Sequence, residues 1–211
     1  TYPDTTLNVT YRYDEADAVT GCAGSFAKGH LTRIIENNGG LVYCYDAHGN
    51  VVTKQQTVGM VTTTTRYTWT AGDRLSSVNT ANGTTITYAR DTVGRINAVV
   101  AKPLGGTAIT VASNVAYQPL GTIASYTLGN GQTVTRTHDA NGQLTDIVSP
   151  AFSLHFARDP MGNITAFGDT PGTSPSSETY GYDPLYRLTT VNEGSGNAVE
   201  AYTYNKTGDR L

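Results

Sequence analysis

Apolar and polar residues alternate along much of the chain in short segments. Residues 144–148, Leu-Thr-Asp-Ile-Val, show this pattern. A period of two is typical of β-strands, in which successive side chains point to opposite faces. Pairs such as Asn38-Gly39, Asn82-Gly83 and Asn130-Gly131 separate the segments, and such pairs favour hairpin turns. The pattern therefore predicts an all-β chain of consecutive antiparallel strands.

A seven-residue motif, Tyr-Asp-x-x-Gly-x-apolar, recurs along the chain. The first positions of successive copies fall at 45, 69, 90, 117, 138, 158, 182 and 204. A further copy opens at Tyr13 and is interrupted before Gly29. The residues identified at the aromatic, aspartate and glycine positions are Tyr13, Asp14, Tyr45, Asp46, Gly49, Trp69, Asp91, Gly94, Tyr117, Gly121, Asp139, Gly142, Asp159, Gly162, Tyr182, Asp183, Tyr204 and Gly208.

Each part of the motif has a structural explanation. The aspartate side chain can accept hydrogen bonds from backbone N–H groups just ahead of it, and glycine supplies a positive φ. The apolar residue starts a return strand, so each repeat contributes two strands and two turns. The chain is thus expected to form a meander of about sixteen to eighteen antiparallel strands with almost no helix.

Aromatic residues stand two positions apart ahead of several turns, as do Tyr43 and Tyr45. This spacing puts both rings on one face of a strand, where packing against cross-strand neighbours is the favoured interpretation. Stacking of exposed rings on sugars is the alternative.

Two segments interrupt the repeats, an insertion at residues 15–28 and a loop rich in Pro, Gly and Ser at 170–177. The repeat resumes beyond each of them, so we expect a single repeat region over residues 1–211. Cys22 and Cys44 could form one bridge, although free thiols are the favoured interpretation.

Composition excludes several classes of protein. Charged residues make up 15% of the chain and the net charge is −3, with no cluster of Lys and Arg, which argues against nucleic-acid binding. No run of 18 apolar residues is present, so no membrane span is expected. A hydrophobic content of 38% is enough to build a core, so the chain should not be disordered.

The sequence contains no evident catalytic, cofactor or metal site. The four histidines, at positions 30, 48, 138 and 155, lie in different repeats without metal-ligand spacing. Asp46, Asp91, Asp139, Asp159 and Asp183 stand at the same position of their repeats. Such recurrence is better explained by structure than by catalysis, which needs a single cluster of residues in differing environments. No nucleophile elbow, phosphate loop or dinucleotide fingerprint occurs. We therefore expect a protein that is not an enzyme and has no cofactor.

The motif and its spacing resemble the YD repeats of the RHS family, over residues 11–211. Members are large, mostly bacterial proteins, secreted or exposed at the cell surface, and teneurins are animal relatives. The resemblance implies a long β-sheet that spirals into a shell around a variable C-terminal domain, often a toxin used in bacterial competition. Asp159-Pro160-Met161-Gly162 is similar to part of that family's self-cleavage region. Leu154 stands where its proline would be, so we assign this stretch to a repeat turn.

The expected function is therefore that of a non-catalytic segment of an RHS-type β-shell, which encapsulates a toxin or effector domain. Its partners would be the remaining repeats and the C-terminal cargo of the same polypeptide. The alternative is an adhesion module that recognises a cell-surface glycan or receptor. We also expect the chain to be a fragment with an open, curved sheet, because the return strand of the last motif has not begun at Leu211.

Overall fold

The computed structural model describes residues 3–169 and 177–211, so the predicted loop at 170–177 lies outside the described residues except for its last position. Strands dominate the described chain, and helix is confined to η1 (Thr5–Leu7) and the one-turn α1 (Asp17–Thr20). None of the described helices is long and apolar enough to cross a membrane. The strands are β1 (Thr10–Tyr13), β2 (Leu31–Glu36), β3 (Gly39–Tyr45), β4 (Val51–Val58), β5 (Val61–Trp69), β6 (Leu75–Asn79), β7 (Thr85–Arg90), β8 (Ile96–Lys102), β9 (Ile109–Tyr117), β10 (Ile123–Leu128), β11 (Thr133–His138), β12 (Leu144–Val148), β13 (Ser153–Arg158), β14 (Ile164–Gly168), β15 (Glu178–Tyr182), β16 (Leu188–Glu193) and β17 (Ala198–Ala201).

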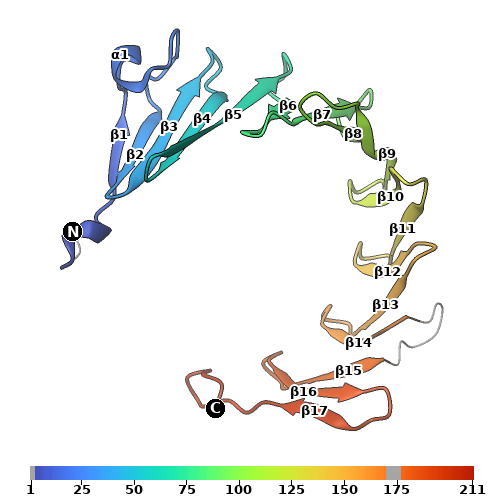
Figure 1. The fold of residues 1–211 in the computed structure, drawn as a ribbon. Coiled ribbons are helices and arrows are strands. Elements are labelled where there is room, and N and C mark those ends of the chain that lie inside the picture. The colour runs from blue at the N-terminus through green and yellow to red at the C-terminus, as the bar shows by residue number, and fades with distance from the viewer. Residues whose placement is uncertain (1–2, 170–176) are drawn as a thin grey trace. The chain divides into compact units, whose positions relative to one another are not determined.

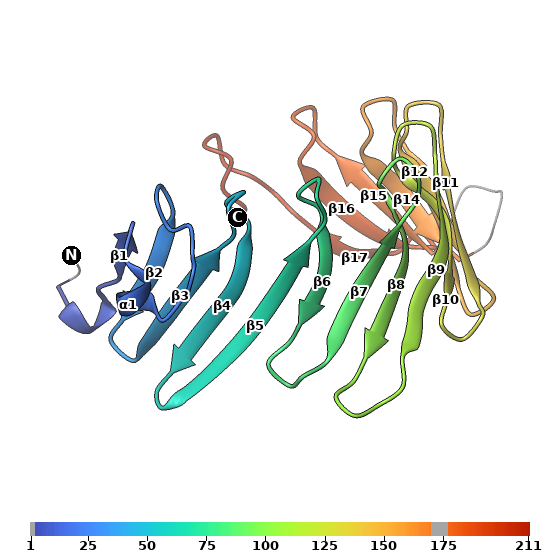
Figure 2. The same cartoon turned by 90° about the horizontal axis from the view of Figure 1, so that it is seen from above.

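Within the described residues the fold is an antiparallel meander of 17 strands, as the alternation and the repeats predicted. The chain divides into two compact units, Thr1–Val111 and Ala112–Leu211. In the first unit each strand from β1 to β8 pairs with the next along the chain. In the second unit the same holds from β9 to β17. Figures 1 and 2 show the strands of each unit in this consecutive order.

The motif forms a tight turn, as the sequence predicted. At residues 139–143 the Gly142 N–H donates to the Asp139 carbonyl oxygen at 3.0 Å, and the Asp139 N–H donates to the Gln143 carbonyl oxygen at 2.9 Å. Gly142 has φ +78°, and His138 pairs with Leu144 across a register shift. This is a type I turn closed by a G1 bulge, the common three-residue hairpin. The Asp139 carboxylate also accepts the N–H groups of Asn141 and Gln143.

In two copies of the motif the fifth residue adopts the left-handed backbone conformation although it is not glycine. Tyr186 occupies the glycine position of its copy and still has φ +61°. In the copy that starts at Trp69, Asp73 has φ +55°, whereas its neighbour Gly72 has no positive φ. The bulge therefore imposes this conformation on whichever residue follows the turn, and glycine adopts it with the least strain.

Replacing Gly142 by valine should lower the free energy of unfolding by about 1–3 kcal/mol, because a branched residue is strained at positive φ. An added Cβ would meet only a Leu120 methyl carbon, at 3.7 Å, so the loss reports backbone strain rather than a clash. Gly72→Val is the matched control, because Gly72 lies in open space without a positive φ. Urea unfolding of both variants tests this, and equal stabilities would contradict it.

One predicted turn is displaced. The pair Asn38-Gly39 was expected to form the turn between β2 and β3, but Gly39 lies in β3 and pairs with Glu36. Gly39 has φ +152°, a value that residues with a Cβ rarely adopt, and a Cβ there would lie 2.0 Å from the Thr57 carbonyl oxygen in β4. Glycine is needed at this position for the close approach of a neighbouring strand, and not for a turn.

Each unit presents one apolar and one polar face of its sheet. Directly opposed residues share a face, so the register puts Tyr67, Val78 and Ile86 together on one face and Thr68, Ser77 and Thr87 on the other. In the second unit Phe156 and Phe167 are opposed on the apolar face. Few side chains among residues 3–169 and 177–211 are fully buried, since no second layer of these residues packs on the sheet; the buried residues are Thr20, Cys22, Thr32, Tyr45, Val134, His155, Ala166 and Gly168.

Candidate functional site

The motif residues that the sequence singled out lie at the hairpin turns or at the strand ends beside them, dispersed from repeat to repeat. Their aspartates serve the turns. The Arg187 backbone N–H donates to the Asp183 carboxylate, which lowers the pKa of Asp183 although desolvation opposes the shift. The Arg187 guanidinium also donates to this carboxylate, at 2.7 Å. Asp14, whose copy is interrupted, instead accepts the Gly29 N–H at the far end of the insertion.

The first residue of the motif joins neighbouring repeats, which the sequence pattern alone did not reveal. Its side chain donates a hydrogen bond to the carbonyl oxygen of the seventh motif residue in the preceding repeat. Tyr, Trp and Arg can all occupy this position because each has a donor at the end of a long side chain. The bonds are Tyr45 to Leu31 (2.6 Å), Trp69 to Val51 (2.9 Å), Arg90 to Leu75 (2.8 Å), Arg158 to Leu144 (3.3 Å), Tyr182 to Ile164 (2.8 Å) and Tyr204 to Leu188 (2.7 Å).

His138 is the exception at this position. Its Nδ1 atom is buried and has no hydrogen-bond partner in the described part of the chain. The imidazole is shorter than a tyrosine or arginine side chain.

Replacing His138 by tyrosine should raise the free energy of unfolding by about 1 kcal/mol. The phenol can reach the Ile123 carbonyl oxygen, the seventh motif residue of the preceding repeat, and the substitution removes an unpaired buried nitrogen. His138→Phe is the matched control, because it fills similar space without a donor. Thermal unfolding of both variants measures the difference, and a tyrosine variant no more stable than the phenylalanine variant would count against the bond.

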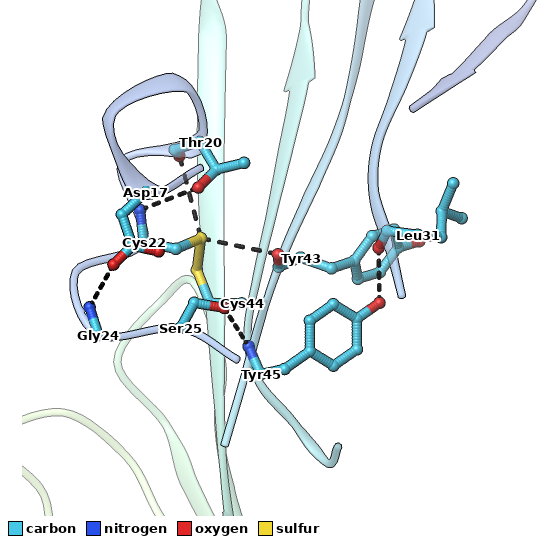
Figure 3. The surroundings of a disulfide bond; sticks show 9 residues. All are labelled: Asp17, Thr20, Cys22, Gly24, Ser25, Leu31, Tyr43, Cys44 and Tyr45. Carbon is cyan, nitrogen blue, oxygen red and sulfur yellow. Dashed lines mark hydrogen bonds between the residues drawn. A yellow bond between two sulfur atoms is a disulfide. The ribbon is translucent and has the colours of Figure 1, made fainter. Parts of the chain in front are cut away.

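The insertion at residues 15–28 departs most from the repeat pattern and is joined covalently to the sheet. Cys22 and Cys44 form a disulfide, with their Cα atoms 5.4 Å apart (Figure 3). The expectation of free thiols was therefore wrong. The insertion folds back over β3, where α1 lies, and this brings together two cysteines separated by 22 positions. The spacing of the two cysteines in the sequence does not indicate that the insertion folds back over this strand.

Hydrogen bonds to the backbone of Tyr45, the last residue of β3, reinforce the covalent link. The Tyr45 N–H donates to the Ser25 hydroxyl at 2.9 Å, and the Phe26 N–H donates to the Tyr45 carbonyl oxygen at 3.1 Å. The Tyr45 ring stacks on His30 with centroids 4.5 Å apart and is 8% exposed. The insertion thereby completes the first repeat, whose own turn it replaces.

An ion pair holds the start of the insertion. Arg33 donates two hydrogen bonds to the Glu15 carboxylate, at 2.7 and 2.5 Å, and the buried Thr32 hydroxyl donates a third at 2.9 Å. The bond from Arg33 lowers the pKa of Glu15 to about 2, against a smaller opposing effect of desolvation. Bidentate pairs of this kind are among the stronger charge-assisted hydrogen bonds.

Glu15 should make this part of the chain sensitive to acid. Because its pKa is lower in the folded chain than its ordinary value of 4.5, its contribution is complete above pH 4.5 and is lost as the pH falls towards 2. The melting temperature of the wild type should exceed that of Glu15→Gln at pH 6, and the gap should close between pH 4.5 and 2. Glu200→Gln, which removes an exposed carboxylate, is the control. A gap that stays constant with pH would contradict the assignment.

Several clefts open on the described part of the first unit, and three of them bear on function. One of about 640 Å³ lies between the insertion and the first complete turn, and its lining includes Phe26, Lys28 and His48. A second, of about 210 Å³, reaches both cysteines and includes Arg66. The third, an apolar groove of about 310 Å³, is lined by Tyr43, Val51, Lys54, Tyr67, Trp69 and Leu75.

One buried polar pair breaks the repeat in the second unit. His155 is 3% exposed, and its Nδ1 atom contacts the carboxylate of Asp146 on the adjacent strand. Partial burial of Asp146 acts to raise its pKa, but hydrogen bonds from His155 and Thr145 outweigh this and lower it. No group of three or more His, Cys, Asp or Glu side chains that could hold a metal occurs in residues 3–169 and 177–211.

No protein-family model matches the chain, and no curated protein matches it. Solved structures of Tc toxin chains share its fold. A TcdB2-TccC3-Cdc42 structure matches with a TM-score of 0.79 and 17% identity over 100% of this chain. TcdB2-TccC3 without its hypervariable C-terminal region gives 0.78 and 16% over 99%, and a Photorhabdus luminescens Tc holotoxin pore gives 0.76 and 16% over 100%. The chain spans 13% of the length of each of these chains.

Proposed function

We propose that this chain is a wall segment of an RHS-type β-shell that encloses another domain of the same polypeptide, and that it performs no catalysis. The observation that carries the proposal is the match of the chain to a short stretch of the much longer TcdB2-TccC3 chain, at a TM-score of 0.79. The YD motif, which resembles that of the RHS family, supports the same conclusion from the sequence.

The bonding between repeats suits a wall. Each bond from the first motif residue ties one hairpin to the backbone of the preceding hairpin, so the sheet can extend repeat by repeat without a second layer. A single-layered sheet leaves its apolar face for a partner to cover, since a continuous apolar surface exposed to water is unfavourable. A domain held inside the shell would provide that cover.

The disulfide supports an exported location for this wall. Structural disulfides form and persist in oxidising compartments and are rare in the cytosol. We therefore place the chain in a secreted or surface-exposed bacterial protein.

Protection of the enclosed domain tests the proposal. In the complete polypeptide that carries this chain, a protease that digests the isolated cargo domain should leave it intact. Gly40→Ala, which disrupts β2 to β4 of the wall, should make the cargo sensitive, whereas Gly72→Ala should not. Equal sensitivity of the cargo in the intact polypeptide and in isolation would refute enclosure.

The groove around Trp69 supports a second candidate function, the binding of a cell-surface glycan. Tyr43, Tyr67 and Trp69 bring three aromatic rings together with Lys54, an arrangement on which a sugar ring can stack. The indole N–H of Trp69 already donates to Val51 in the sheet. Titration with glycans, followed by NMR, should show saturable shifts at Tyr67 that Tyr67→Ala abolishes; unchanged spectra would eliminate this function.

A further inference from the structure

A cleft leads from solvent to the disulfide. It is formed by the loop at residues 21–25 of the insertion, by Cys44 at the end of β3, and by residues of β4 and β5, and its volume is about 210 Å³. Arg66 lines it and is exposed, and no hydrogen bond or ion pair involves its side chain in the part of the chain that the structure describes. A small molecule can therefore approach the disulfide through this cleft, beside the positive charge of the Arg66 side chain.

The two cysteine residues differ in exposure. Cys22 is 4% exposed as a residue, whereas Cys44 is only partly buried, which favours Cys44 Sγ as the atom that an incoming nucleophile attacks. Cys22 Sγ lies 3.6 Å from the Tyr43 carbonyl oxygen and 4.0 Å from that of Thr20 (Figure 3). These oxygens are placed to accept the S–H of Cys22 once the bond is broken.

We propose that the Cys22–Cys44 bond is a thiol–disulfide exchange site, opened by a dithiol that enters this cleft beside Arg66. The thiolate of the dithiol attacks Cys44 Sγ, forming a mixed disulfide and breaking the Cys22–Cys44 bond. Cys22 leaves as a thiolate and takes a proton from solvent. The second sulfur of the dithiol loses its proton to solvent and attacks the first, releasing Cys44, which is protonated in turn. The protein gains two electrons and two protons, and the dithiol leaves as a cyclic disulfide.

Arg66 serves this reaction by its charge, because the attacking species is an anion. The loop at 21–25 and Cys44 already flank the path, so no strand needs to separate before the attack. After reduction the insertion is held by the Glu15–Arg33 pair and by hydrogen bonds at the Tyr45 backbone. It buries little apolar surface, since Phe26 is 58% exposed. The inferred consequence is a looser insertion over an intact sheet.

The rate of reduction under native conditions tests the exchange site. The chain is incubated with dithiothreitol at neutral pH and low salt, quenched with acid, and analysed for free thiols by alkylation and mass spectrometry. Reduction should proceed faster than global unfolding, which hydrogen exchange of the β3 amides reports. Reduction that only keeps pace with global unfolding would overturn the proposal.

Variants test the role of the cleft. Arg66→Glu should slow reduction by about threefold or more, with Arg66→Gln between it and the wild type. Lys102→Glu, the same charge change at an exposed residue outside the cleft lining, should leave the rate unchanged. With 2-mercaptoethanol, a monothiol, the trapped mixed disulfide should sit on Cys44. Equal rates for Arg66→Glu and Lys102→Glu, or an adduct on Cys22, would refute this route.

The state of the insertion after reduction is read from individual amides. The Phe26 and Tyr45 N–H groups, which join the insertion to β3, should exchange at least about tenfold faster in the reduced chain. The Ile147 amide in β12 should be unaffected. Unchanged exchange at Phe26 and Tyr45 would show that the bond does not hold the insertion. The reaction does not depend on the shell function, so failure of either leaves the other standing.

Discussion

Replacing Gly40 by alanine should lower the free energy of unfolding by about 3 kcal/mol. An added Cβ would lie 2.2 Å from the Ile34 carbonyl oxygen in β2, far inside contact distance. A Cβ on the neighbouring Gly39 would lie 2.0 Å from the Thr57 carbonyl oxygen in β4, so β3 has little room to move away from β2. The clash is with the backbone of β2, so no side-chain rotation relieves it, and the φ of +158° at Gly40 adds strain for any residue with a Cβ.

Gly181→Ala is the control for this prediction. Gly181 also lies within a strand, but its Cβ would meet the Thr190 hydroxyl, which can rotate away. Its cost should be about 1 kcal/mol or less. Urea unfolding of both variants measures the comparison. If Gly40→Ala proves as mild as Gly181→Ala, β2 and β3 are not packed as closely as the structure shows.

Removing the disulfide should have an effect of similar size. The double variant Cys22→Ala, Cys44→Ala should lose about 3 kcal/mol, because a bond across 22 positions restricts the unfolded chain. The double change avoids leaving an unpaired thiol. The wild type measured in the presence of a reductant should show the same loss. A loss below about 1 kcal/mol in both experiments would mean that the bond constrains the unfolded chain little.

The repeat explains why so much of the fold could be predicted. The alternating segments and the Asp-x-x-Gly turns are local signals, and the turn at 139–143 has the hydrogen bonds and positive φ that its residues favour. A meander pairs each strand with its neighbour in sequence, so predicting the strands and turns also predicts their pairing. The same reasoning assigned Asp159 and Gly162 to a turn, and the structure confirms it.

The candidate site was harder to predict because its contacts join residues that are distant in sequence. The Cys22–Cys44 bond depends on the path of the insertion, and the pair Glu15–Arg33 depends on β1 lying beside β2. The bonds from the first motif residue were also missed. In the sequence, Tyr, Trp and Arg at one position look like imperfect matches to the motif. In the structure each of them donates to the carbonyl oxygen of the seventh motif residue in the preceding repeat.

The sequence by itself determined the strands, their order and most of the turns, because each follows from residues within a few positions of one another. Only the tertiary structure decided the disulfide, the bonds between repeats and the reason for Gly39 and Gly40. These depend on which backbone atoms of neighbouring strands come close, and that distance is set by the register and twist of the whole sheet. Local propensity therefore predicts the sheet, whereas its covalent and hydrogen-bonded links arise from packing between strands.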